Sequence, residues 1–144
     1  MKELFTAIKT RFDSSTGATL RALCSSRMYV GRANQNVTGE YITLTNPAGA
    51  TDHSISQGLS SSIGGSYENQ TITFHVWTTS RSPSKAWTIV NAIKNLYDFQ
   101  NLSLSSSYTM LHAQRTSPGV QIEQPAEKGW QVAVDYDYRI GRRK

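Results

Sequence analysis

Near its C-terminal end the chain alternates apolar and polar residues over a long segment, and this pattern constrains the fold more than any other. Successive side chains of a β-strand point to opposite faces of the sheet. An alternation of this length therefore predicts a long strand in an antiparallel sheet, with one buried and one solvated face. The apolar positions are Trp130, Val132, Val134, Tyr136, Tyr138 and Ile140.

Shorter segments show the same alternation or are rich in β-branched and aromatic residues, and we expect strands there as well. The clearest is 71–78, in which Ile72, Phe74 and Val76 share one face and His75 and Trp77 lie on the other. Further strands are expected at 27–30, 41–45, 108–116 and 120–123. Asn46 and Pro47 are expected to end the strand at 41–45.

A helix is predicted directly after the strand at 71–78. Ser82 is a suitable N-cap, and Pro83 fits the first helical position, where its missing N–H is not needed. From Ser82 the pattern runs for about 15 residues, roughly four turns. Its broad apolar face consists of Ala86, Ile89, Val90, Ile93, Leu96 and Tyr97.

The N-terminal segment also has helical spacing. Leu4, Phe5, Ile8 and Phe12 form one apolar stripe, and Leu20 with Leu23 indicates a second, short helical piece. Helices followed by strands in this order predict an α+β fold. We expect a mainly antiparallel sheet, with the long helix and the N-terminal helix packed on one face.

The length of 144 residues indicates a single domain, 1–144. Residues 46–69 are rich in Ser and Gly and are predicted to form a mobile loop that orders against a partner. The alternative is that part of this segment, with Ile55 and Leu59, extends a hairpin arm. Residues 141–144 are predicted to form a frayed basic tail. The single cysteine, Cys24, allows no internal disulfide, and no apolar stretch reaches the length of a membrane span.

The sequence offers little to an enzyme. Ser66 follows two glycines but lacks a nucleophile-elbow motif, and no nucleotide-binding glycine motif occurs. His53, His75 and His112 are isolated in sequence; His75 and His112 would form a pair only by meeting across strands. We therefore predict no enzymatic activity, no metal and no cofactor. A hydrolase using Ser66 or His75 is the alternative to be tested by geometry.

Charged residues near the C-terminus are the candidate binding residues. Asp135, Asp137 and Arg139 lie on the polar face of the last strand, and with Arg115 they are candidate subunit contacts. Arg142, Arg143 and Lys144 are candidates for contact with DNA or an acidic partner. The formal net charge of +5 indicates weak attraction to anions, so a small basic nucleic-acid-binding module is an alternative function.

Three segments together resemble a known protein family. In the first segment the opening helix is followed by Arg27-Met28-Tyr29 and then by Tyr41-Ile42-Thr43-Leu44. In the second, Ile72-Thr73-Phe74-His75-Val76-Trp77 runs into the helix Ser82 to Phe99 and then Leu102-Ser103-Leu104. In the third, Arg115 is followed by a turn and by Gly129-Trp130-Gln131-Val132-Ala133-Val134-Asp135-Tyr136. In this order the segments resemble the tail completion or tail terminator proteins of long-tailed phages and related gene-transfer particles. The resemblance covers most of the chain.

The resemblance implies a structural virion protein without chemistry of its own. Such a subunit forms a ring, typically hexameric, on the head-proximal end of the tail tube, where it ends polymerisation and joins the tail to the head connector or neck protein. It implies residence at the head–tail junction of the virion, with assembly in the host cytoplasm. From the basic residues we expect non-specific contact with packaged DNA, and from the lack of a long apolar stretch no membrane association. Another head–tail connector or a tail tube protein is the alternative within this class. For the ring contacts we expect the sheet edges and the loop at 46–69.

Overall fold

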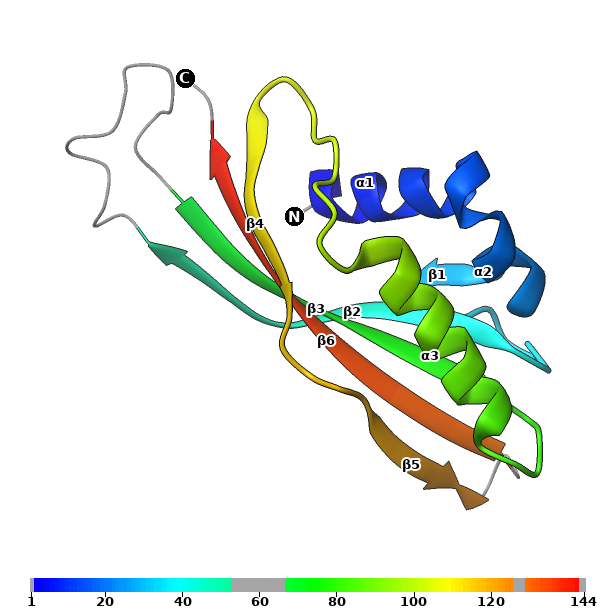
Figure 1. Ribbon diagram of the computed structural model, residues 1–144. Coiled ribbons are helices and arrows are strands. Elements are labelled where there is room, and N and C mark those ends of the chain that lie inside the picture. Colours follow the sequence, from blue (N-terminus) through cyan, green and yellow to red (C-terminus); the bar gives the residue numbers. More distant parts are fainter. Residues whose placement is uncertain (1, 53–66, 126–128, 143–144) are drawn as a thin grey trace.

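The protein forms one sheet covered on one face by helices (Figure 1). The computed structural model describes residues 2–52, 67–125 and 129–142. The helices are α1 (Lys2–Asp13), the 3-10 helix η1 (Ser15–Gly17), α2 (Ala18–Leu23) and α3 (Ser84–Tyr97). The strands are β1 (Met28–Val30), β2 (Tyr41–Asp52), β3 (Tyr67–Thr78), β4 (Tyr108–Arg115), β5 (Val120–Gln124) and β6 (Gly129–Arg142).

The sheet confirms the predicted α+β architecture. Its strand order is β1-β2-β3-β6-β4, and β5 also pairs with β6. The pair β1–β2 is parallel, whereas every other pair is antiparallel. Strands β4 and β5 follow one another along the same side of β6, since β3 occupies the other side. One edge of the sheet is therefore β1, and the opposite edge is formed by β4 and β5.

The core lies between the sheet and the helices. Ile72, Phe74 and Val76 of β3 and the apolar positions of β6 face the helices, as the alternation predicts. The Phe74 ring lies 5.1 Å from the Tyr97 ring and 5.3 Å from the Tyr136 ring, measured between centroids. The Tyr97 hydroxyl donates a hydrogen bond of 2.8 Å to the carbonyl oxygen of Ile8. This bond ties α3 to α1 above the sheet.

The predicted loop at 46–69 is wrong in its bounds. Strand β2 continues to Asp52 and β3 already begins at Tyr67, so the two strands form a longer hairpin whose far end extends past the helices (Figure 1). The register shifts between Thr45 and Ala48. A bulge at this point accommodates Pro47, which has no N–H for a regular ladder. The rest of the predicted loop, 53–66, lies outside the described residues.

Two smaller predictions also need correction. Gly141 and Arg142 pair with β3 and β4 as part of β6, so a frayed tail from 141 is wrong for these two residues, whereas 143–144 lie outside the described residues. Helix α3 begins at Ser84, one residue later than predicted. Gly129 is the first residue of β6. A Cβ there would lie 1.9 Å from the carbonyl oxygen of Thr78, so a side chain would clash with the neighbouring backbone.

Candidate functional site

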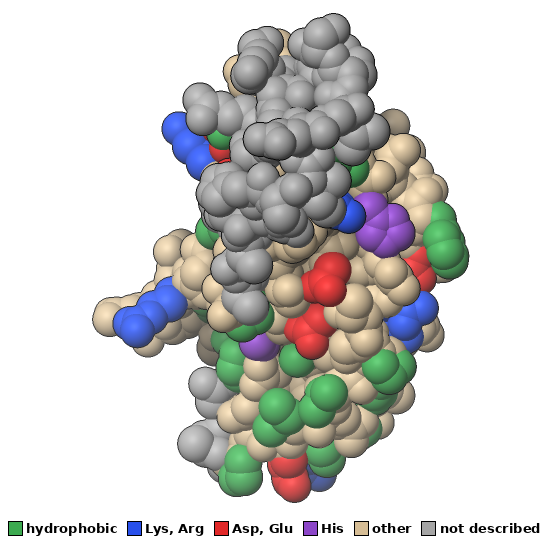
Figure 2. Space-filling model, turned by 90° about the vertical axis from the view of Figure 1, so that its left-hand side faces the viewer, with side chains coloured by type: hydrophobic (Ala, Val, Ile, Leu, Met, Phe, Trp, Pro, Cys, Tyr) green, Lys and Arg blue, Asp and Glu red, His purple; other side chains and the backbone are tan. Residues whose placement is uncertain are grey.

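The face of the sheet opposite the helices is open. Figure 2 looks onto this open face, where two acidic side chains lie side by side in the middle and hydrophobic side chains gather below them. No helix within the described ranges covers this face (Figure 1). None of the described helices is long and apolar enough to cross a membrane. The open face and its two edges are therefore the surfaces to examine for a binding role.

Asp135 and Asp137 occupy the open face, as their positions in the alternation predict. The Thr73 hydroxyl donates to Oδ1 of Asp135 at 2.5 Å, and the Thr71 hydroxyl donates to Oδ1 of Asp137 at 2.6 Å. Both threonines are cross-strand partners of these aspartates in the β3–β6 ladder. These bonds hold the two carboxylates in fixed positions on the sheet. Their role in subunit contacts stays a prediction.

Arg139 lies further along the same face, near the end of the β2–β3 hairpin. Its guanidinium carbon is 5.0 Å from the centroid of the Tyr67 ring, a cation–π contact. Its Nε is buried, and the described part of the chain supplies no hydrogen bond to it. Arg139 is thus held by an aromatic ring rather than by an ion pair with Asp135 or Asp137.

The structure does not bring Arg115 to the open face with these residues. Arg115 is the cross-strand partner of Tyr136 and lies on the side covered by helices. There its Nε donates to both carboxylate oxygens of Asp98 at 3.2 Å. The register of β4 shifts between Met110 and His112, and this bulge reverses which residues face the helices. Arg115 therefore fastens β4 to the end of α3, away from Asp135 and Asp137, and its role as a subunit contact stays a prediction.

The predicted basic tail is described only in part. The backbone of Arg142 pairs with Tyr108 at the end of β6. Arg143 and Lys144 lie outside the described residues. Contact of these residues with DNA or an acidic partner stays a prediction.

A chain of hydrogen bonds crosses the open face from β2 to β5. His75 Nε2 lies 2.8 Å from the Thr45 hydroxyl, and its Nδ1 lies 2.7 Å from Nε2 of Gln131. Gln124 Nε2 donates to Oε1 of Gln131 at 2.8 Å. Since an amide nitrogen can only donate, Nδ1 of His75 accepts and the ring is neutral. Burial lowers the pKa of His75, against an opposing effect of Asp135 that tends to raise it.

We expect this neutral histidine to make the fold less stable in mild acid. The unfolded chain binds a proton at His75 near pH 6.5, whereas the folded chain does so only at lower pH. The contribution of His75 to the free energy of unfolding is therefore fully present above pH 6.5. It falls as the pH drops towards the pKa of the folded state, by at most about 1.4 kcal/mol per pH unit. Urea unfolding at pH 7.5, 6 and 5 measures this slope. His75→Gln should flatten it and His112→Gln should keep it; equal slopes in all three proteins would contradict the assignment.

The catalytic alternative gains no support from the geometry. His75 belongs to β3 and is opposite Ala133, whereas His112 belongs to β4 and is opposite Arg139, so the two histidines do not meet. His112 contacts Gln114 instead, with 3.2 Å between Nε2 and Oε1. Ser66 lies outside the described residues. Among the residues that the structure describes, no group of three His, Cys, Asp or Glu side chains is placed to hold a metal ion.

Both edges of the sheet expose apolar side chains. Val120 and Ile122 of β5 are 54% and 42% exposed, and Leu111 of β4 is also exposed. At the opposite edge Val30 of β1 is 52% exposed. Apart from Phe99, these are the exposed large hydrophobic residues of the described chain. An unpaired strand edge with apolar side chains is a ready surface for pairing with another chain.

The comparisons with known proteins concern the fold. No protein-family model matches the sequence, and no curated protein matches it. A chain in a solved structure described as "Virion of native gene transfer agent (GTA) particle" superposes with a TM-score of 0.78. The match covers 97% of this chain and 96% of that chain at 14% sequence identity. This protein therefore shares its whole fold with a protein of a gene transfer agent virion.

Proposed function

We propose that the protein is a structural virion protein that forms a ring at the head-proximal end of a tail tube. In this role it ends tube polymerisation and joins the tail to the head connector, at the head–tail junction of the particle. The observation that carries the proposal is the shared fold, which spans nearly all of this chain and of a chain in a gene transfer agent virion. A hexamer is the ring size that we propose.

The two unlike edges of the sheet support a ring. A ring requires heterologous contacts, in which one patch of a subunit meets a different patch of its neighbour. The β1 edge and the β4–β5 edge lie on opposite sides of one sheet, and each exposes apolar side chains. Pairing the β5 edge of one subunit with the β1 edge of the next, repeated from subunit to subunit, satisfies both of these strand edges in a closed ring.

The open face and the C-terminal end supply further contacts in this proposal. Asp135, Asp137 and Arg139 present fixed charges to a neighbouring subunit or to the tail tube protein. Arg142, Arg143 and Lys144 contact the packaged DNA or an acidic partner. None of these contacts needs a cofactor or a reaction.

Negative-stain electron microscopy of the purified full chain at high concentration tests this function. We expect closed rings with a central hole wide enough for a DNA duplex. Long tubes would favour a tail tube protein, because a terminator stops at one ring. Monomers, at high concentration and also when tail tubes are supplied, would overturn the proposal. Should those monomers bind DNA with an affinity that falls steeply with salt, the nucleic-acid-binding alternative would take its place.

A further inference from the structure

Phe99, just after the end of α3, is an aromatic residue that stands out from the described part of its own chain. Its side chain is 97% exposed. Its φ is 58°, in the left-handed region that bulky residues rarely adopt. A folded chain thus places a large apolar ring in water and holds it on a strained backbone. Strain of this kind concentrates at functional positions.

The backbone on both sides of Phe99 is fixed to the body of the protein. On one side the Asp98 carboxylate accepts hydrogen bonds from Arg115 and from the Tyr136 hydroxyl, the latter at 2.6 Å. On the other side Gln100 Oε1 accepts from Arg11 at 2.9 Å, and the Gln100 N–H donates to the carbonyl oxygen of Tyr97. The backbone that carries Phe99 is therefore already ordered before binding, so placing the ring against a partner costs little backbone entropy.

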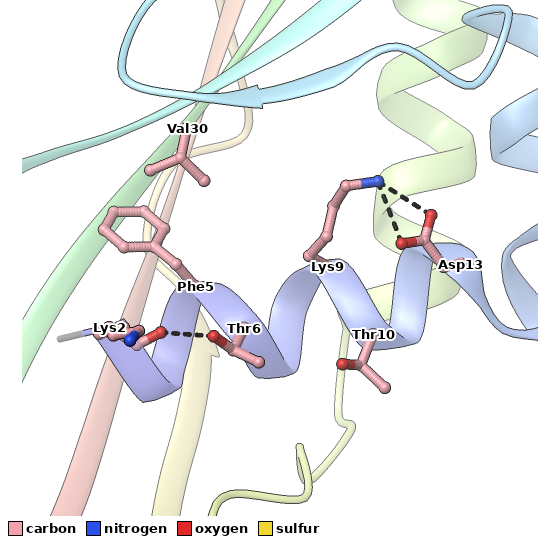
Figure 3. A pocket seen from close by; sticks show the side chains of 7 residues that line it. All are labelled: Lys2, Phe5, Thr6, Lys9, Thr10, Asp13 and Val30. Atoms are coloured by element: carbon pink, nitrogen blue, oxygen red, sulfur yellow. Dashed lines mark hydrogen bonds and ion pairs between the residues drawn. The ribbon is translucent and has the colours of Figure 1, made fainter.

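A hollow that fits an aromatic ring lies between α1 and β1. Its volume is about 620 Å³, and Figure 3 shows Phe5 of α1 pointing towards Val30 of β1 across it. Thr6 and the stem of Lys9 line it along the helix. At its rim the Lys9 ammonium pairs with Asp13 at 2.9 Å. The hollow is mainly apolar, and it adjoins the β1 edge, where Val30 is exposed.

We propose that Phe99 of one copy of this chain inserts into the α1–β1 hollow of the next copy. Because Phe99 is almost fully exposed, it does not occupy the hollow of its own chain. Ring and hollow are different patches, so this contact is heterologous, the type that closes rings. The hollow also continues into the β1 edge proposed above as a subunit contact. The inference rests on the proposed ring and names Phe99 as the aromatic anchor of its subunit contact. Buried aromatic anchors contribute a large share of the binding energy at protein interfaces.

Cross-linking between copies tests the pairing. Asn101 is exposed two residues after Phe99, and Thr6 is exposed on the hollow. The full chain with Thr6→Cys and Asn101→Cys, treated with a short bis-maleimide, should give a ladder of covalent oligomers on a denaturing gel. Each single-cysteine variant should give dimers at most, because the native Cys24 is buried. Adding Phe99→Asn to the double-cysteine chain should reduce the ladder at least tenfold.

Sedimentation velocity of the chain without added cysteines is the second measurement. Phe99→Asn should weaken self-association at least tenfold, whereas Phe99→Leu, which keeps an apolar side chain, should lose less. Asn tolerates the left-handed backbone, so the folded monomer should melt no lower than wild type. Wild-type association of Phe99→Asn, or an undiminished ladder, would overturn this inference. Rings formed by both the wild type and Phe99→Asn would overturn the Phe99 contact and leave the proposed function standing. A wild type that forms no rings would count against the proposed function itself.

Discussion

Val120→Lys combined with Ile122→Lys is expected to abolish ring formation and to leave the monomer folded. Both side chains are about half exposed on the edge strand β5, so the monomer loses little packing, about 0.5 kcal/mol for each substitution. In a ring the same side chains enter the contact with the next subunit. Forming that contact would remove two ammonium groups from water and hold the two like charges close together, and both effects oppose pairing. Natural proteins place lysines on edge strands to prevent pairing in this way.

The control for this variant adds the same charge away from the edge. Asn91 and Asn95 are exposed on α3, and Asn91→Lys with Asn95→Lys raises the net charge equally. Electron microscopy should show rings for the control and single subunits for the edge variant, and thermal melting should show that both are folded. Rings in the edge variant would remove β5 from the proposed subunit contact.

Elements governed by local periodicity were predictable from the sequence. The alternation of β3 and β6 and the stripe of α3 identify both the elements and their buried faces, because the period of side-chain direction is a property of the backbone. The continuation of β2 beyond Thr45 was not predictable in this way. Asn46 and Pro47 have the composition of a turn, and only pairing with β3, which tolerates a bulge there, keeps them in the strand.

The candidate site was predictable only where no bulge intervenes. Asp135 and Asp137 lie on the open face because β6 runs without interruption from Trp130. Counting alternate residues in β4 fails, because the shift between Met110 and His112 moves Arg115 to the covered side. The chain of hydrogen bonds through His75 and the bonds that hold the backbone on both sides of Phe99 depend on contacts between distant segments. No local pattern in the sequence carries such information.

Asp98→Ala is expected to destabilise the fold by about 2–4 kcal/mol. The Asp98 carboxylate joins three elements, because it follows α3 directly and accepts bonds from Arg115 of β4 and Tyr136 of β6. Tyr136 is 1% exposed, so its hydroxyl would be left buried without a partner, at a cost of about 1–3 kcal/mol. The Arg115 side chain is about a third exposed, so loss of its ion pair adds about 1 kcal/mol.

A double-mutant cycle with Tyr136→Phe separates these contributions. Burial, and after it the hydrogen bond to Asp98, raises the pKa of Tyr136, so the phenol remains a donor at any pH at which the protein is handled. Tyr136→Phe alone should cost about 0.5–1.5 kcal/mol, since the carboxylate keeps Arg115. The double variant has no hydroxyl left without a partner. Its loss in free energy of unfolding, measured with urea, should therefore be smaller than the sum of the losses of the two single variants by at least about 0.5 kcal/mol. Strict additivity would mean that water replaces Asp98 at the hydroxyl, and the carboxylate would then stabilise the fold through Arg115 alone.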